Sequence, residues 1–196
     1  MTNKMADKSI LIVGVGGQGT LLASKVLGQV VMQEGLDIKM SEVHGMAQRG
    51  GSVVTQVRFG EKIYSPLIPD EGADIILSFE MMEALRYLPL LKKDGKIIIN
   101  EQKIAPMPVL VGAVKYPEDP IKEIQKMGIE VIGLKAYELA KEAGNMKAAN
   151  VVLLGVLAKD LDFDENMWEN AIKETVPERF LEVNMKAFEM GYNYNI

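Results

Sequence analysis

The segment SEVHGMAQRGGSVVTQVRFG, residues 41–60, collects residue types that can do chemistry between two stretches that read as strands. His44 is the only histidine of the chain, and an imidazole can shuttle a proton or donate a hydrogen bond near neutral pH. An arginine offers a planar fork for a carboxylate or phosphate, and consecutive glycines can turn backbone N–H groups inward around an anion. The candidate residues are His44 for catalysis, and Gln48, Arg49, Gly50 and Gly51 for holding an anion or anchoring an interface. The alternative is an exposed loop that carries a lone histidine.

A second candidate site is the glycine-rich turn GVGGQG, which follows an apolar run and precedes a stretch with helical spacing. In such a turn the first glycine permits the tight bend, the second lets the backbone approach a phosphate, and the third lets the helix pack on the strand. The candidate phosphate-turn residues are Gly14, Gly16, Gly17, Gln18 and Gly19. Glu42 lies roughly 20 residues further on, where dinucleotide-binding folds place the acid that holds a ribose. The alternative is a turn that binds no ligand and meets another chain.

Other polar residues have simpler explanations. Glu80 and Glu83 begin a predicted helix, where acidic side chains suit the helix dipole, so capping accounts for them. Asn145 is expected to cap a later helix, and Lys147 and Asn150 follow it closely enough to reach a ligand there. No group of residues in the sequence predicts a metal site.

The composition excludes several classes of function. A net charge of -5 argues against nucleic acid or an anionic membrane as the main partner. The chain has no cysteine, which excludes disulfides, thiolate zinc sites and thiolate-ligated iron–sulfur clusters within it. The N-terminus MTNKMADKS lacks the apolar region of a signal peptide, and no apolar run is long enough to span a bilayer. We therefore expect a cytoplasmic protein.

Strands and helices alternate along most of the chain. Strand-forming runs lie at the start of 9–20, in 37–43, 51–60, 73–79, 95–101 and 108–117, and in the first part of 128–144. A hairpin turn is expected at residues 60–62, with the chain continuing into 61–66. Helical spacing covers 20–35, 80–92 up to the region of Pro89, the second part of 128–144, 145–161, 165–177 and 177–194.

This order predicts an α/β fold with a Rossmann-like, mostly parallel sheet and helices on both faces. Continuous apolar strands are typical of a sheet that is covered on both sides. The first strand, helix and second strand form a β–loop–α–β unit, which is right-handed when its strands are parallel neighbours. We expect one domain over 1–196, with a sheet part at about 8–143 and a helical part at about 144–196.

Three segments carry a resemblance to a known family. ILIVGVGGQGT, SEVHGMAQRGGSVVTQVRFG and ADIILSFEMMEALR resemble the gamma-type subunit of 2-oxoacid:ferredoxin oxidoreductases. The form SEVHGMAQRGG is most similar to the beta subunit of indolepyruvate oxidoreductase. The resemblance runs from about Ser9 to the C-terminal helices, and the second motif is far more specific than the glycine turn.

The resemblance implies a subunit of a complex that oxidises 2-oxoacids, here indolepyruvate or another aryl pyruvate, to acyl-CoA. Thiamine diphosphate with Mg and 4Fe–4S clusters would carry the chemistry, CoA would be the co-substrate, and ferredoxin would take the electrons through the complex. With no cysteine and no Gly-Asp-Gly motif followed by the magnesium-binding Asn, this chain is expected to hold none of these cofactors itself. They would lie in a large partner subunit, without which the chain is expected to be inactive. The 44–51 segment would then lie at the joint between subunits, holding the substrate carboxylate or a CoA phosphate.

Three other readings compete with this one. A stand-alone Rossmann oxidoreductase predicts that the isolated chain binds a nicotinamide nucleotide. An adenylating enzyme of the ubiquitin-activating type shares the glycine turn but generally needs a catalytic cysteine, which this chain lacks. A purely structural scaffold predicts that loop variants lose assembly in proportion to activity. The sequence does not fix the oligomeric state of the isolated chain, and a homodimer is one alternative, since an apolar interface left without its partner can find a second copy.

Overall fold

The computed structural model describes residues 6–45 and 51–195, and a six-stranded sheet runs through these residues. The strands are β1 (Lys8–Val15), β2 (Asp37–His44), β3 (Ser52–Gly60), β4 (Ala73–Ser78), β5 (Leu91–Asn100) and β6 (Glu130–Leu134), in the spatial order β2-β3-β1-β4-β5-β6. β1, β4, β5 and β6 run parallel, whereas β3 runs antiparallel to both of its neighbours. The predicted α/β class with a mostly parallel sheet is confirmed.

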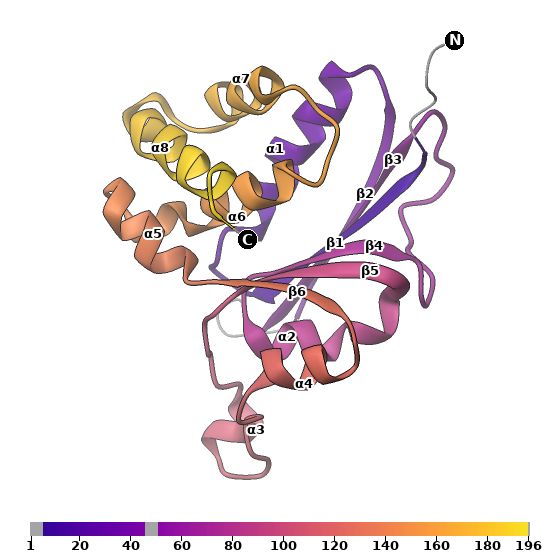
Figure 1. The fold of residues 1–196 in the computed structure, drawn as a ribbon, viewed down its shortest axis with the longest axis vertical. Helices are drawn as coiled ribbons and strands as arrows, with labels where there is room; N and C mark the ends of the chain where they lie inside the picture. Colours follow the sequence, from indigo (N-terminus) through magenta and orange to yellow (C-terminus); the bar gives the residue numbers. More distant parts are fainter. Residues whose placement is uncertain (1–5, 46–50, 196) are drawn as a thin grey trace.

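Helices cover both faces of this sheet (Figure 1). The helices are α1 (Thr20–Gln33), α2 (Met81–Arg86), α3 (Met107–Leu110), α4 (Pro120–Lys126), α5 (Ala136–Ala143), α6 (Ala149–Ala158), α7 (Glu165–Thr175) and α8 (Leu181–Tyr192), with 3-10 turns η1 (Leu88–Leu90), η2 (Met146–Ala148) and η3 (Glu178–Phe180). The side chains of Ile10 and Ile12 face α1 and the C-terminal helices, while Leu11 and Val13 face α2 and α4. This alternation explains why β1 is apolar without interruption.

The position of β3 differs from the simple unit that the sequence suggests. β2 follows α1 in the chain, but β3 folds back from β2 and lies between β2 and β1. The first two strands are therefore parallel but not neighbours. A hairpin needs only a short connection, which accounts for the pairing of β2 with β3, and the long-range pairing of β3 with β1 then sets the strand order.

Two predicted elements are wrong, and proline explains both. The strand predicted at 108–117 is instead helix α3 followed by turns, with Pro108 in its first turn, where the missing N–H costs nothing. The chain after Gly60 does not return as a strand but runs irregularly to β4. Pro66 and Pro69 lie in that stretch and lack the N–H that a sheet ladder requires.

The C-terminal helices form a densely packed layer. All ten residues of α6 are buried, as its apolar sequence predicts. Gly155 on α6 and Gly191 on α8 let the two helix backbones approach so closely that a Cβ at either position would overlap the other helix. In the ranges 6–45 and 51–195, no helix has both the length and the apolar character needed to cross a bilayer.

Candidate functional site

The predicted site residues that the structure describes converge on one edge of the sheet. The glycine turn follows the carboxyl end of β1, and β4 ends beside it. The connection after β1 runs over one face and the connection after β4 over the other, so the edge between these strands is a topological switch point. Open α/β sheets bind ligands in the crevice at such a point.

The hairpin brings the second motif to the same edge. Ser52, the first residue of β3, pairs with Val15, and His44 ends β2 alongside. The backbone N–H of Gly16 donates to the carbonyl of Gly51 at 2.9 Å, which joins the two motifs directly. Gln48, Arg49 and Gly50 lie outside the described residues. Of the predicted 44–51 segment, the structure thus places Gly51 beside the glycine turn and His44 at the end of β2, with β3 between β2 and β1.

Gln18 turns its side chain into the protein. Its Oε1 accepts from the N–H of Val15 at 2.7 Å, and its Nε2 donates to the carbonyl of Phe79 at 2.8 Å and to Oε1 of Gln102 at 2.9 Å. The amide therefore ties the end of β1 to the segments that follow β4 and β5. The sequence pattern assigns Gln18 to the phosphate turn, and the structure shows its side chain holding that turn in shape.

The glycines of the turn differ in their surroundings. A Cβ on Gly14 would lie 2.8 Å from Gln18 Oε1, and one on Gly19 would lie 2.7 Å from Asn150 Nδ2. Gly19 also has a φ of +85°, which a residue with a side chain rarely adopts. A Cβ on Gly17, by contrast, would have no described atom within 4 Å of it. The turn is packed on its inner side and open at Gly17.

Asn145 and Asn150 serve the backbone on the helical side of the turn. The side chain of Asn145 accepts from the N–H of Lys147 at 3.0 Å and caps η2, as predicted. Asn150 is buried, and its Nδ2 donates to the carbonyl of Gly19 at 3.2 Å. Asn150 therefore fastens α6 to the start of α1.

His44 pairs with Glu42 two residues earlier on the same strand. Nε2 of His44 contacts Oε1 of Glu42, and the other carboxylate oxygen of Glu42 accepts from the hydroxyl of Thr55 at 3.1 Å. The imidazole is more than half exposed, so it is accessible from solvent. Glu42 does not occupy the place of a ribose-binding acid, because β3 separates its strand from β1 by two interstrand spacings, roughly 10 Å. This geometry weakens the hypothesis that the chain is a stand-alone oxidoreductase that binds NAD.

Two buried acids lie beneath the edge. Glu80 caps α2, as predicted, since its Oε2 accepts from the N–H groups of Met82 at 2.7 Å and Glu83 at 2.9 Å. Its other oxygen, Oε1, accepts from the N–H of Ile104 at 3.0 Å and from the hydroxyl of Tyr116. Glu80 thus does more than cap a helix.

Glu83 also has a second role that capping does not predict. One of its oxygens accepts from the hydroxyl of Ser52, and the other pairs with Nε of Arg86 at 3.0 Å. The hydroxyl of Ser52 also lies 3.2 Å from that of Tyr87. Because Ser52 directly follows the 44–51 segment, Glu83 anchors the end of that segment to α2. The only sequence signal for this role is the position of the acids directly after a strand, since burial cannot be read from their spacing.

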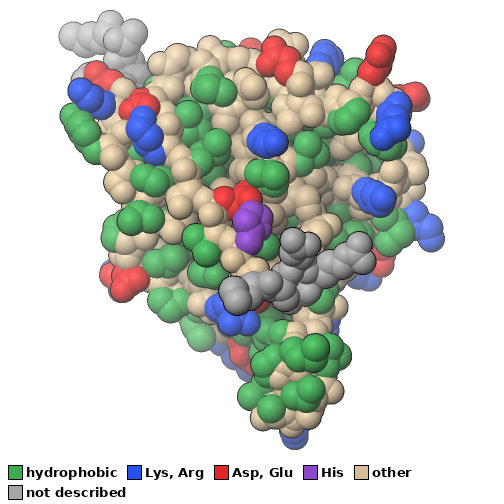
Figure 2. All heavy atoms as spheres, turned by 180° about the vertical axis from the view of Figure 1, so that it is seen from behind, with side chains coloured by type: hydrophobic (Ala, Val, Ile, Leu, Met, Phe, Trp, Pro, Cys, Tyr) green, Lys and Arg blue, Asp and Glu red, His purple; other side chains and the backbone are tan. Residues whose placement is uncertain are grey.

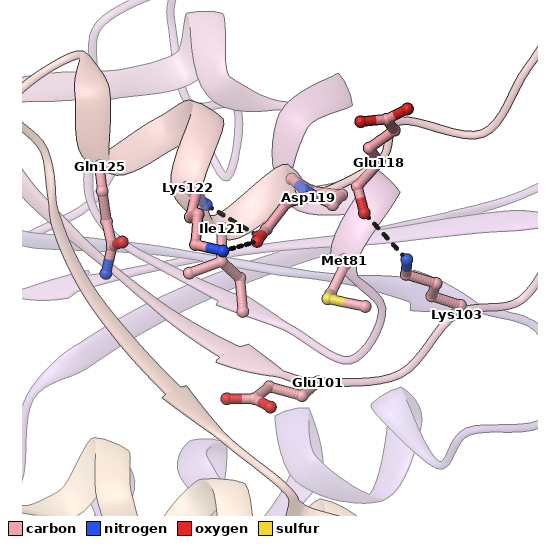
Figure 3. Close-up of a pocket in the computed structure, with 9 residues that line it drawn as sticks. Met81, Glu101, Lys103, Glu118, Asp119, Ile121, Lys122 and Gln125 are labelled. Carbon is pink, nitrogen blue, oxygen red and sulfur yellow. Dashed lines mark hydrogen bonds and ion pairs between the residues drawn. The ribbon is translucent and has the colours of Figure 1, made fainter.

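A hollow of about 390 Å³ opens at the same edge, between the residues after β5 and the start of α4 (Figure 3). It is lined by Met81, Glu101, Lys103, Glu118, Asp119, Pro120, Ile121, Lys122 and Gln125. Lys122 pairs with Asp119 at 2.8 Å, and this hydrogen bond lowers the pKa of Asp119 and raises the pKa of Lys122. The lining holds three acids, Glu101, Glu118 and Asp119, against the two lysines Lys103 and Lys122, so the hollow is net negative and offers no net cationic site for a carboxylate.

The donor set does not fit a protein-held metal or cluster. Across the described ranges, no three His, Cys, Asp or Glu side chains are grouped so that they could hold a metal ion. The sequence supplies no thiolate for an iron–sulfur cluster. Among the described residues at this edge, backbone N–H groups can donate hydrogen bonds and the exposed imidazole of His44 can donate a hydrogen bond or transfer a proton.

Fold and edge together define a doubly wound α/β domain with a glycine turn at its switch point. A family model described as pyruvate ferredoxin/flavodoxin oxidoreductase matches residues 9–194, so the chain belongs to that family.

Two relatives and one solved structure refine this assignment. The chain is 43% identical to indolepyruvate oxidoreductase subunit IorB of Thermococcus kodakarensis over 95% of both chains. It is 27% identical to ketoisovalerate oxidoreductase subunit VorA of Methanothermobacter marburgensis, where the match spans 94% of this chain but 36% of the relative. Among solved structures it is similar to the gamma subunit of a keto/oxoacid ferredoxin oxidoreductase from Geobacter sulfurreducens, with a TM-score of 0.69, 25% identity, and coverage of 94% and 96% of the two chains. This chain is thus a subunit of a 2-oxoacid oxidoreductase.

Proposed function

We propose that this chain is the small subunit of a cytoplasmic indolepyruvate:ferredoxin oxidoreductase. The complex would release CO2 from indolepyruvate or another aryl pyruvate, transfer the acyl group to the thiol of CoA, and pass the electrons to ferredoxin. The observation that carries the proposal is the hydrogen bond from Gly16 to Gly51, which unites the two sequence motifs at the switch point. The 43% identity to an indolepyruvate oxidoreductase subunit over nearly the whole chain supports the choice of substrate.

The cofactors belong to the partner in this proposal. The large subunit would hold thiamine diphosphate with Mg, which would supply the decarboxylation chemistry, and 4Fe–4S clusters, which would supply electron transfer. The absence of cysteine and of a metal-binding group in the described residues supports this division. The chain by itself would have no oxidoreductase activity, because it would contribute only one wall of the active site.

The role of this chain would be to bind and position anions at the interface with the large subunit. Arg49, with Gln48, Gly50 and Gly51, would hold the carboxylate of the 2-oxoacid or a phosphate of CoA. The open side of the turn at Gly17 would face the same space. His44, exposed and paired with Glu42, would donate a hydrogen bond or a proton at the edge of the site.

The test is reconstitution with the cognate large subunit. Both chains are co-expressed, and dye reduction is measured with indolepyruvate and CoA, omitting each chain, CoA or the 2-oxoacid in turn. The proposal expects activity only when both chains and both substrates are present. A parallel series with phenylpyruvate, pyruvate and 2-oxoglutarate measures the substrate preference. Full activity of the large subunit alone would refute the proposed role of this chain.

A further inference from the structure

An apolar arm projects from the molecule at the candidate-site edge. We define the arm as residues 104–116, which include α3 and the turns after it. Its exposed large apolar side chains are Met107, Leu110, Val111 and Val114, each between 55% and 69% exposed. Figure 2 shows the projecting lower end of the molecule, where this segment lies in Figure 1, covered largely by hydrophobic side chains. Such clustering on a projection marks a protein contact rather than the scattered apolar residues of an ordinary surface.

We propose that this arm is the anchor by which the chain docks into an apolar groove of the large subunit. The inference rests on the proposed function, because it names the contact through which that complex assembles. A short helix that presents methionine, leucine and valine side chains fits a groove lined by apolar side chains.

The arm is held in shape at its base. The N–H of Ile104 and the hydroxyl of Tyr116, at the two ends of the arm, both bond to Oε1 of the buried Glu80. At the base of the arm, Nζ of Lys103 donates to the carbonyl of Glu118 at 3.0 Å. The same Nζ lies 5.5 Å from the centre of the Tyr116 ring. Because both ends are fixed to one buried group, the apolar side chains are presented before any partner binds, which lowers the entropic cost of association.

Backbone hydrogen bonds also order the tip. Residues 109 to 114 donate six N–H bonds back to the carbonyls of Pro106, Met107, Pro108 and Val109. The exposed apolar side chains therefore lie on an ordered, hydrogen-bonded segment and not on an extended loop. The tip is a folded unit that exposes Met107, Leu110, Val111 and Val114.

The position of the arm fits the proposed site. The arm leaves the sheet just after β5, where Gln102 accepts a hydrogen bond from Gln18 and its carbonyl accepts one from the N–H of Met81. Docking at the arm would therefore bring the large subunit to the edge that holds the glycine turn. This matches a site shared between two chains.

The comparisons favour the large subunit over a second copy as the occupant of the arm's apolar surface. Reciprocal exchange of arms between two copies around a two-fold axis is the competing arrangement, and the sedimentation measurement below tests it. The match to VorA spans 36% of that relative, so the corresponding region there is continuous with a longer polypeptide. That relative thus carries further protein surface in the same chain as the matched region. Four side chains also fall short of the roughly 800 Å² that a stable interface buries on each partner, so the arm is an anchor within a wider contact.

The test compares two double variants in binding to the tagged large subunit. The first, Met107→Ser with Leu110→Ser, removes apolar atoms from the arm. The matched control, Met127→Ser with Leu67→Ser, changes a methionine and a leucine of similar exposure outside the arm. All four side chains are exposed, so both variants should keep the wild-type circular dichroism and urea midpoint. The dissociation constant is measured for each, together with the sedimentation of each chain alone.

We expect the arm variant to bind the large subunit roughly tenfold or more weakly and the control to bind within about twofold of wild type. Equal affinity of arm variant and wild type would overturn the inference while leaving the proposed function intact. An equal loss in the control would overturn it too, because apolar surface in general would then drive binding. If the wild-type chain is a dimer, the arm variant a monomer, and affinity for the large subunit unchanged, a second copy is the occupant. Failure of the wild-type chain to bind the large subunit would refute both proposals together.

Discussion

The backbone N–H of Gly16 lies 2.9 Å from the carbonyl oxygen of Gly51, and these residues belong to the two motifs that stand out in the sequence. Their contact depends on β3 lying beside β1, since that register places Ser52 opposite Val15. A shift of the segment that ends at Gly51 would therefore be transmitted to the glycine turn through one short hydrogen bond. The two motifs are thus physically joined at one edge of the sheet.

Replacing Arg49 tests whether that site holds an anion. Arg49→Ala in the reconstituted complex should lower kcat/KM by about 10- to 100-fold, because a charge-assisted bond to the bound anion is lost. Separate titrations of the 2-oxoacid and of CoA identify which anion is bound, by showing which apparent KM rises. The kcat/KM of Arg49→Lys should lie between those of wild type and Arg49→Ala, since lysine keeps the charge without the planar fork. Arg179→Ala, at an exposed arginine over the ring of Phe180, is the control. Wild-type kinetics in Arg49→Ala would remove this residue from the site.

Replacing Gln18 tests its structural role. Gln18→Ala should lower the free energy of unfolding by about 1–3 kcal/mol, because the buried N–H of Val15 loses its partner and the link to Gln102 disappears. Urea denaturation of the isolated chain measures this change. Gln125→Ala removes an exposed glutamine from α4 and should stay within about 0.5 kcal/mol of wild type. A Gln18 variant as stable as the control would contradict the structural assignment.

Contact between α6 and α8 should tolerate no added methyl group. A Cβ on Gly191 would lie 2.0 Å from the carbonyl oxygen of Val152, so Gly191→Ala should destabilise the chain by about 3 kcal/mol through forced separation of the helices. Gly28→Ala is the matched change, because the nearest neighbours of its Cβ would be side-chain ends, the terminal methyl and sulfur of Met40 at 3.4 and 3.7 Å and Cδ1 of Ile38 at 4.0 Å. That variant should lie within about 1 kcal/mol of wild type. Thermal and urea unfolding of both variants decide the point, and similar midpoints would refute the close contact.

Tyr116 gives the fold a dependence on alkaline pH. Burial, and then the hydrogen bond to the Glu80 carboxylate, raise the pKa of Tyr116 above its ordinary value of 10.0. The neutral phenol is thus favoured in the folded chain. Its contribution to stability is complete below pH 10.0 and is lost as the pH rises toward the folded pKa, because only the unfolded chain releases the proton in that window.

The measurement is the urea midpoint at about pH 9 and about pH 11, on either side of the ordinary tyrosine pKa. The midpoint of Tyr116→Phe should fall less across this interval than that of wild type. Tyr64→Phe, which changes an exposed tyrosine, should follow the wild-type decrease. Equal decreases in all three proteins would show that the hydroxyl of Tyr116 does not stabilise the fold.

Much of the sheet could be predicted because short local sequence patterns indicate its strands. The uninterrupted apolar runs of β1 and β4 indicate strands covered on both faces, and the fully buried α6 is apolar all round. Gly144 ends α5 where the sequence places the end of a helix. These features depend on a few neighbouring residues, so the sequence carries them directly.

Strand order and buried polar contacts could not be predicted in the same way. The insertion of β3 beside β1 is a pairing between distant segments, and either order of β2 and β3 satisfies the local pattern. Glu80 and Glu83 look like ordinary acids at a helix start, and only the fold brings Tyr116 and Ser52 to them. The 108–117 segment has the composition of a strand, yet Pro108 suits the first turn of a helix equally well.

The double attachment of Glu80 also has a kinetic consequence. Because the Glu80 carboxylate caps α2 through Oε2 and holds both ends of the arm through Oε1, the arm is attached to a group whose position the folded core already fixes. Its order is therefore established when the chain folds and not when a partner arrives. The rate of docking would then depend on how often the two proteins collide in a suitable orientation, and not on a slow folding step at the interface.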